Sequence, residues 1–326
     1  MLLSVVVPTF NNAEILPLCL RRILDQTLPK EAYEIVLVDD ASTDGTAEIV
    51  AKAPQDYPGS RIQCFSNKNN MGPASARNVG IAAARSNLVV FIQDDILVKP
   101  DFLQRHVQFH QSFVEKEAAL IGLVAFDETL RITPFMKWLE NGHQFDYGRL
   151  VGEGKTKRSA DSDRVAIEII DKPYLTFYTP NLSVKRQFLL ENDGFDENLF
   201  VPGGAVFEDT ELGYRLSQQG LRLFFDRNIL VSHRHQKTLA STCALRFVSG
   251  QVARRLYARH PELQDVFRDN FKTGLSRWVL NEATIRPLES IARFCEERLN
   301  AGLFFWLVCR YYYNEGYRLK SKPQRR

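Results

Sequence analysis

The first part of the chain alternates between short apolar runs and amphipathic stretches with helical spacing. Four apolar runs, at residues 2–7, 34–38, 61–65 and 88–92, have the length and the β-branched or aromatic content of buried strands. Helical spacing follows each of the first three runs, and a further helix is expected at about residues 100–116. Strands and helices that alternate in this way predict an α/β fold with a doubly wound, mostly parallel sheet.

The pattern becomes less regular beyond this point. A strand is expected at residues 119–126, and no clear period is visible from there to about residue 175. Two short strands at 221–225 and 229–231 follow, and from about residue 236 onward only helical spacing remains. We therefore expect three parts along the chain, with boundaries near residues 126 and 235 and with a helical C-terminal extension.

Acidic residues follow directly after two of the predicted strands. Asp39 and Asp40 come at the end of the second strand, and Asp94 and Asp95 follow the fourth. The carboxyl ends of parallel strands line the ligand crevice of an α/β sheet, so both pairs are expected at one edge. Adjacent carboxylates are costly to desolvate unless donors or a cation neutralise them, and a divalent metal is the simplest such cation. A strand that ends in a solvated acidic turn is the alternative.

Charged residues also lie near the starts of two predicted helices. Arg77 follows Pro73 in a helix of small residues, near the end where the helix dipole disfavours a cation. It is either a surface residue or a cation that faces a phosphate or a base. Glu208 and Asp209 open an amphipathic helix, where the dipole favours acids, so helix capping alone would explain them.

Composition narrows the class of protein. The chain has 326 residues, of which 44% are hydrophobic and 25% charged, which is typical of a soluble globular protein. A net charge of +3 gives no case for nucleic acid binding. Five scattered cysteines without a CxxC pair favour a reducing, cytoplasmic setting. No leader segment is visible, and the apolar run at residues 302–309 is far shorter than the ~18 residues that span a bilayer.

Seven short motifs then stand in a fixed order along the chain. They are Val7-Pro8-Thr9-Phe10-Asn11, residues 38–46, residues 69–80, Gln93-Asp94-Asp95, Gly194-Phe195-Asp196, residues 207–216 and His233-Arg234-His235. Each motif alone is weak, but the ordered set is specific. It resembles the family 2 glycosyltransferases of the GT-A fold, and the resemblance covers roughly residues 2–235.

The resemblance implies a role for each residue that matches a family motif. The positions that hold the nucleotide-sugar donor are matched by Pro8, Thr9, Asn11, Asp40, Arg77 and Asp94. Asp95 matches the acid of the DXD motif that binds the metal, and His233 or His235 matches a histidine that completes the metal shell or touches the diphosphate. Asp209 matches the catalytic base. The first position of the DXD pattern is Gln93 instead of Asp. This departure bears on how tightly the protein holds metal without substrate.

The implied activity is metal-dependent and inverting transfer of a sugar from a nucleoside diphosphate sugar to an acceptor hydroxyl, in glycan or glycoconjugate biosynthesis. The donor would be a UDP-sugar, the cofactor Mn or Mg, and the acceptor a carbohydrate or a lipid-linked molecule. In this interpretation residues 1–126 form the nucleotide-sugar-binding half, residues 127–235 the acceptor-binding and catalytic half, and residues 236–326 the helical extension.

Two alternatives come from other functional classes. A sugar nucleotidyltransferase would need a glycine-rich basic loop near the first strand, and residues 8–13 lack one. A non-catalytic module that binds sugar nucleotides would be indicated by loss of Asp95 or Asp209, and both are present.

The helical extension has two interpretations of its own. Residues 303–308 are apolar, and residues 310–326 hold six Lys or Arg against one acid. Apolar bulk beside cations is typical of peripheral contact with an anionic membrane surface, here at its inner face. Alternatively, these helices pack on the core or on a second copy of the chain in a homodimer.

Overall fold

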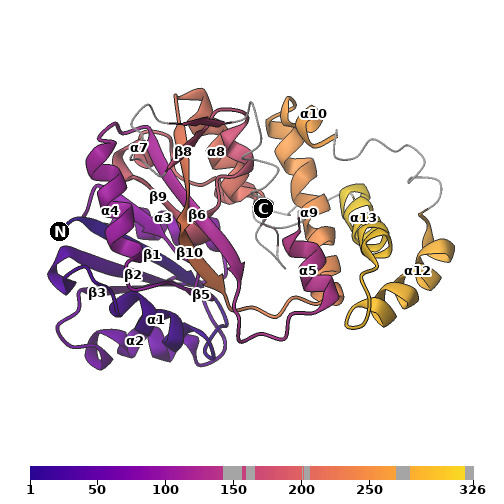
Figure 1. Ribbon diagram of the computed structural model, residues 1–326, viewed down its shortest axis with the longest axis horizontal. Coiled ribbons are helices and arrows are strands. Elements are labelled where there is room, and N and C mark those ends of the chain that lie inside the picture. The colour runs from indigo at the N-terminus through magenta and orange to yellow at the C-terminus, as the bar shows by residue number, and fades with distance from the viewer. Residues whose placement is uncertain (142–155, 159–165, 200, 202–205, 269–279, 320–326) are drawn as a thin grey trace. The chain divides into compact units, whose positions relative to one another are not determined.

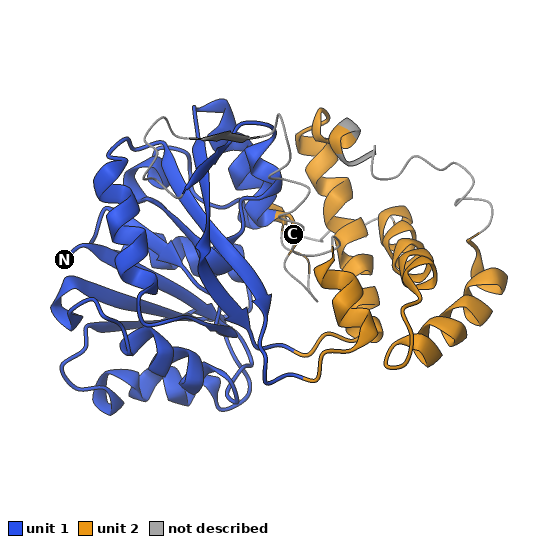
Figure 2. Cartoon of the chain, in the orientation of Figure 1, with its two compact units in different colours: residues 1–130, 145–197, 208–235 blue, residues 131–144, 198–207, 236–326 orange. Residues whose placement is uncertain are grey.

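The computed structural model describes residues 1–141, 156–158, 166–199, 201, 206–268 and 280–319. The chain forms two compact units, which Figure 2 distinguishes by colour. The first unit comprises residues 1–130, 145–197 and 208–235, and the second comprises residues 131–144, 198–207 and 236–326. Each unit has its own hydrophobic core.

The first unit is built on a mixed sheet, which is ten-stranded in the part of the chain that the structure describes (Figure 1). The strands are β1 (Leu3–Thr9), β2 (Tyr33–Asp39), β3 (Ile62–Ser66), β4 (Leu88–Phe91), β5 (Ile96–Leu97), β6 (Ala118–Phe126), β7 (Thr156–Arg158), β8 (Ile167–Ile169), β9 (Leu182–Lys185) and β10 (Arg222–His233). Their order is β3-β2-β1-β4-β9-β6-β10-β8-β7, with β5 paired to β10. Strands β1 to β4 are parallel, whereas β9 lies antiparallel between β4 and β6. The α/β fold class predicted from the sequence is confirmed.

Helices cover both faces of this sheet. They are α1 (Leu16–Leu24), α2 (Thr46–Asp56), α3 (Pro73–Ala83), α4 (Phe102–Ser112), α7 (Arg186–Leu190) and α8 (Glu208–Gln218), with short 3-10 turns at η1 (Lys30–Ala32), η2 (Pro173–Leu175), η3 (Thr179–Asn181) and η4 (Glu197–Leu199). Val5 and Val7 of β1 belong to the core that contains α1, α2 and α4, while Val6 points into the core with α3, α7 and α8. A Cβ atom on Gly80 would lie 2.3 Å from Cγ1 of Val6, so α3 approaches the sheet closely.

Strand β10 joins the two short strands that the sequence pattern predicts for residues 221–231. Its register against β6 shifts between Asp226 and Leu230, which is a β-bulge. The side-chain amide of Asn181 donates hydrogen bonds to the carbonyls of Ile229 and Leu123, at 2.9 and 3.1 Å. One buried side chain therefore holds both strands at the bulge and fixes η3 to the sheet.

A buried polar cluster lies between α4 and β9. Nδ1 of His106 and Nε2 of His110 lie 2.8 and 2.9 Å from Oγ of Ser183. One hydroxyl can serve both rings when it donates to one imidazole and accepts from the other, and the imidazole that accepts is then neutral. Burial lowers the pKa of His106 to about 3 and lowers that of His110 well below its ordinary value.

We expect these two histidines to make the protein less stable in mild acid. In the unfolded chain each ring has a pKa of about 6.5, so between that pH and the depressed folded pKa the unfolded state binds more protons. The contribution of His106 is fully present above about pH 6.5 and is lost toward pH 3 by about 1.4 kcal/mol per pH unit. His110 acts in the same direction. Urea unfolding of wild type and His106→Gln at pH 5–7 measures this.

Gln108 gives a matched control, because it is exposed on the same helix and carries no titratable group, so Gln108→Ala should leave the slope unchanged. A wild-type slope that His106→Gln does not reduce would contradict the expected effect.

The second unit is helical. Its elements are α5 (Pro134–Glu140), α9 (Leu239–Arg259), α10 (Leu263–Arg268), α12 (Glu282–Cys295) and α13 (Gly302–Arg318). Helices α9 and α13 cross at glycines, because a Cβ atom on Gly250 would lie 2.1 Å from the carbonyl oxygen of Tyr313. Phe305 and Val308 of the apolar run are buried in this unit's core, whereas Leu303 is 66% exposed. Residues 320–326 lie outside the described residues, and no described helix is long and apolar enough to cross a membrane.

Candidate active site

The carboxyl ends of β1, β2 and β4 meet at one edge of the sheet, as the parallel order requires. Thr9 of β1 lies opposite Asp39 of β2, and Pro8 opposite Val38. Oγ1 of Thr9 donates a hydrogen bond of 2.6 Å to Oδ2 of Asp94, which follows β4. The structure therefore brings Thr9 and Asp94 together at this edge.

The acidic pair after β4 is costly to keep ionised. Burial, and then the charge of Asp95, raise the pKa of Asp94 to about 7, although hydrogen bonds from Thr9, Asn12 and Phe10 oppose the shift. Two carboxylates that repel each other in a partly desolvated place favour a bound cation or donors from a ligand. The electrostatics of the pair therefore suit a cation at this position.

Asp95 also contacts the histidines at the end of β10. Nε2 of His233 lies 2.9 Å from Oδ2 of Asp95, and Nδ1 of His235 lies 3.8 Å from the same oxygen. Strands β5 and β10 create this contact, since Ile96 is the antiparallel partner of His233. Carboxylate oxygen and imidazole nitrogen are ligand types suited to Mn²⁺ and similar divalent ions.

The residues that the structure describes contain no group of three or more His, Cys, Asp or Glu side chains arranged to hold a metal ion. Asp95 and His233 can supply ligands, but a complete coordination shell needs further oxygens, such as those of a diphosphate or of water. The residues present therefore fit a cation that is shared with a ligand. They do not fit a closed metal site made by the protein alone.

A second acidic pair opens α8. Oδ2 of Asp209 accepts hydrogen bonds from the backbone nitrogen and from Oγ1 of Thr179, at 3.0 and 2.9 Å. Nη1 of Arg77 lies 3.0 Å from Oε1 of Glu208 and 3.4 Å from Oδ1 of Asp209. Among the described residues, Asp209 accepts no hydrogen bond from its own helix. Helix capping therefore does not account for this side chain.

Arg77 is 1% exposed, so the interpretation of Arg77 as a surface residue is wrong. Its guanidinium lies against the acids of α8 instead of pointing to solvent. A buried cation next to two carboxylates compensates part of their desolvation, which explains why a cation is tolerated near the start of α3.

The ionisation of Asp209 is set by opposing effects. Burial raises the pKa of this carboxyl to about 6, the charge of Arg77 lowers it, and the charge of Glu208 raises it. The two hydrogen bonds from Thr179 lower it further. A carboxylate with this pKa is ionised at neutral pH and is basic enough to accept a proton from a hydroxyl in general base catalysis.

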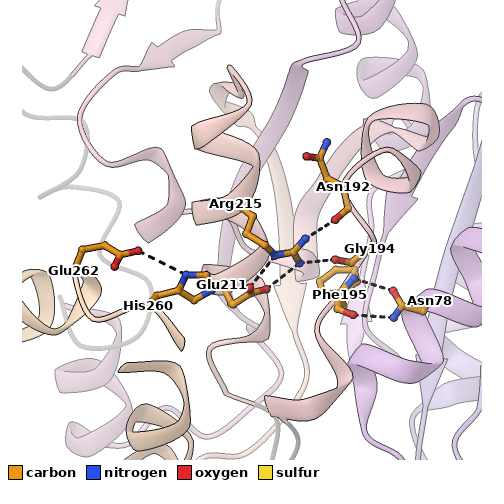
Figure 3. A network of polar contacts seen from close by, with 8 residues as sticks. All are labelled: Asn78, Asn192, Gly194, Phe195, Glu211, Arg215, His260 and Glu262. Atoms are coloured by element: carbon orange, nitrogen blue, oxygen red, sulfur yellow. Dashed lines mark hydrogen bonds and ion pairs between the residues drawn. The ribbon is translucent and has the colours of Figure 1, made fainter. Parts of the chain in front are cut away.

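The ring of Phe195 holds Arg77 in place from its other side. Cζ of Arg77 lies 5.3 Å from the centroid of that ring, a cation–π contact. Asn78, the next residue of α3, bonds both the backbone nitrogen and the carbonyl of Phe195, each at 2.9 Å (Figure 3). The motif Gly194-Phe195-Asp196 thus supports the cation that faces the acids of α8.

Arg215 of α8 fixes the turn that contains this motif. Its guanidinium bonds both oxygens of Glu211, and it donates to the carbonyls of Gly194 and Asn192 (Figure 3). Gly194 has a φ of 57°, and a Cβ atom there would lie 2.5 Å from Oδ1 of Asn78. The turn therefore needs glycine at this position.

Asp40 and Asn11 have structural partners. Asp40 is 3% exposed and accepts hydrogen bonds from the side chain of Asn67 and from the backbone nitrogens of Met71 and Gly72, at 2.7 to 3.1 Å. Its carboxylate therefore organises the loop that leads into α3. Oδ1 of Asn11 accepts a hydrogen bond of 2.7 Å from the backbone of Thr43. Contact of either residue with a nucleotide stays a prediction.

Sequence reasoning gave no site role to Thr179 or Phe195 and considered only helix capping for Glu208. Residues 194–196 stand out as a motif, but no spacing rule links Thr179 or Phe195 to Asp209 or Arg77. Thr179 meets Asp209 across 30 positions, and Arg77 meets Glu208 across 131. Only the folded chain shows these contacts.

Comparison with known sequences places these features in a family. The family model for glycosyl transferase family 2 matches residues 4–156. The uncharacterized glycosyltransferase YfnE of Bacillus subtilis is 28% identical in an alignment of 265 residues that covers 71% of this chain and 64% of that protein. Validoxylamine A glucosyltransferase of Streptomyces hygroscopicus subsp. jinggangensis is 30% identical over 232 residues, or 69% of this chain and 54% of that protein. The chain thus spans roughly half to two thirds of these relatives.

Solved structures show the same fold at low sequence identity. S. aureus TarS 1–349 in complex with UDP-GlcNAc superposes with a TM-score of 0.54 at 18% identity, and the match covers 98% of this chain and 90% of TarS 1–349. The mannosyltransferase PcManGT from Pyrobaculum calidifontis, in complex with GDP-Man and Mn²⁺, gives a TM-score of 0.53 at 18% identity, with 99% and 76% covered. The expected GT-A fold is confirmed by these likenesses.

Proposed function

Since the chain belongs to glycosyl transferase family 2, we propose that it moves a sugar from a nucleoside diphosphate sugar, a UDP-sugar, to an acceptor hydroxyl. The transfer inverts the anomeric centre and depends on Mn or Mg. The acceptor is a carbohydrate or a lipid-linked molecule. Residues 1–126 are proposed to bind the donor, residues 127–235 to bind the acceptor and carry the base, and residues 236–326 to form the helical extension.

The observation that carries this proposal is the contact between Asp95 and His233. It joins the acidic motif after β4 to a histidine 138 residues further along the chain, at 2.9 Å. A carboxylate and an imidazole at the carboxyl edge of the parallel strands are suited to a cation on the diphosphate of a donor.

The residues can be given roles in one displacement step. Asp209 accepts the proton of the acceptor hydroxyl, whose oxygen forms a bond to the anomeric carbon from the face opposite the leaving group. The bond from that carbon to the diphosphate oxygen breaks, and the nucleoside diphosphate leaves with the electron pair. A bound divalent cation supplies Lewis acid stabilisation of the leaving diphosphate. No covalent nucleophile is needed.

The solved relatives support a nucleotide-sugar donor. TarS holds UDP-GlcNAc and PcManGT holds GDP-Man with Mn²⁺. Our choice of a UDP-sugar for this chain is the finer part of the proposal. A panel of nucleotide sugars, each incubated with the protein and Mn or Mg, tests it by release of the free nucleoside diphosphate. Hydrolysis of no donor in the panel would count against the proposal, and release of pyrophosphate from a nucleoside triphosphate with a sugar 1-phosphate would favour the nucleotidyltransferase.

Asp95→Ala is expected to abolish the part of UDP affinity that depends on Mn, because the diphosphate would lose its link to the protein through the cation. Titration calorimetry of UDP with and without Mn measures that part in wild type and variant. Asp101→Ala is the control, since the half-exposed side chain of Asp101 pairs with Arg105, four residues further along the chain, and is not at the carboxyl edge of the sheet. An Mn-dependent affinity that survives in Asp95→Ala would show that Asp95 does not hold the metal.

A further inference from the structure

We propose that Thr179 is the positioning residue of the catalytic base: its hydroxyl and backbone nitrogen hold the Asp209 carboxylate in one orientation and keep it in the ionised form. This inference rests on the proposed function, because it concerns the role given there to Asp209. Thr179 does not itself touch the reacting atoms.

The geometry at Asp209 is that of a carboxylate held from two sides. Thr179 directs both of its donors at Oδ2, at 3.0 and 2.9 Å, while Nη1 of Arg77 lies 3.4 Å from Oδ1. With two hydrogen bonds on Oδ2 and an ion-pair contact on Oδ1, the carboxylate cannot rotate about its Cβ–Cγ bond without losing a partner. The side chain of Asp209 is 15% exposed, although its Oδ1 atom is buried.

Thr179 is itself rigidly placed. It is 1% exposed and opens η3, two residues before Asn181, which is also 1% exposed. Asn181 bonds the carbonyls of Leu123 and Ile229 and so fixes η3 to β6 and β10. A base positioned by a turn that is tied to the sheet keeps its geometry more precisely than one positioned by a free loop.

Arg77 alone cannot orient the Asp209 carboxylate and keep it ionised. Nη1 of Arg77 is closer to Glu208 than to Asp209, at 3.0 against 3.4 Å. Glu208 therefore takes the larger share of that cation, and its own charge opposes ionisation of Asp209. The hydrogen bonds from Thr179 favour the anion, since they are made to the ionised carboxylate. Thr179 is thus needed for orientation and for ionisation together.

The test compares the pH dependence of kcat/KM in wild type, Thr179→Val and Thr179→Ser. Valine keeps the shape and the backbone donor but removes the hydroxyl. We expect the acid limb of the Thr179→Val profile, where kcat/KM falls as Asp209 becomes protonated, to move to higher pH by about 1 unit. At pH values below both limbs kcat/KM should be about tenfold lower than in wild type, and about two units above the limb the two proteins should be equal. Serine restores the hydroxyl and should return the limb to its wild-type position. If Thr179→Val does not fold, Thr179→Ala removes the same hydroxyl and should show the same shift.

Thr176→Val is the matched control, because Thr176 is fully buried in the same segment and its hydroxyl bonds the carbonyl of Pro173, not the acids. If loss of a buried hydroxyl only disturbed the structure, Thr179→Val and Thr176→Val would each lower kcat/KM by the same factor at every pH. An acid limb that stays at the wild-type position in Thr179→Val would overturn the inference.

Failure of this inference can be told from failure of the proposed function. If wild type transfers no sugar, or if Asp209→Asn keeps full turnover, the proposed function is wrong in its activity or in its base. If wild type transfers sugar and Asp209→Asn does not, an unmoved limb in Thr179→Val rejects the role of Thr179 alone.

Discussion

Asp209→Asn is expected to lower turnover by about 10²- to 10⁴-fold while donor affinity stays unchanged, because asparagine keeps the shape of the side chain but cannot accept the proton of the acceptor. The amide oxygen can still accept the two hydrogen bonds that Thr179 now donates to Oδ2 of Asp209. The site should therefore remain assembled. Turnover is measured with the donor identified in the panel, and affinity by calorimetry with the matching nucleoside diphosphate.

Asp193→Asn is the control for this change. Asp193 is exposed and has a φ of 60°, a conformation that asparagine adopts readily. It should keep wild-type turnover. If Asp209 served only to cap α8, asparagine would replace it almost without effect. Wild-type turnover in Asp209→Asn would mean that another residue is the base.

Arg77→Met should destabilise the protein by about 3–5 kcal/mol, the range found when one partner of a buried ion pair is removed. Methionine retains much of the apolar bulk, but Glu208 and Asp209 would be left as buried acids without their cation. The side chain of Arg77 is 2% exposed, so solvent would screen the remaining buried charges only weakly. Urea unfolding at neutral pH measures the loss.

The loss should shrink in mild acid, because Asp209, whose pKa burial raises to about 6, is then protonated and no longer needs the cation. Arg77→Met combined with Glu208→Gln should recover part of the stability, since one buried charge is then removed. Arg105→Met is the control, because Arg105 forms a half-exposed pair with Asp101 that is worth about 1 kcal/mol or less. Equal losses in Arg77→Met and Arg105→Met would contradict the buried ion pair.

The parallel half of the sheet could be predicted from the sequence because its signals are local. Each strand from β1 to β4 is an apolar run that ends in polar residues, and each of the first three is followed by a helix. The position of β9 could not be predicted in this way. Its pairing with β4 and β6 joins residues about 60 to 100 positions apart, and no periodicity encodes that choice.

In the candidate site, too, features with local sequence signals could be predicted and long-range contacts could not. The acids after β2 and β4 could be placed at one edge because parallel strands all point their carboxyl ends the same way. The partners of Arg77 could not be found, since helix position gives the direction of the dipole but not which acids pack against the helix. Thr179 was missed for the same reason, because its contact with Asp209 depends on how η3 lies on β6 and β10.

The insertion of β9 also has a consequence for the order in which the chain can fold during synthesis. Strands β4 and β6 each pair with β9 in antiparallel fashion, and neither pairs with the other. Until residues 182–185 have left the ribosome, both strands present an open edge formed by fully buried positions such as Val89, Val90 and Leu120. Unpaired apolar edges recruit other chains. The first half of the nascent protein therefore carries an aggregation-prone edge until β9 is made, even though that half contains all four parallel strands.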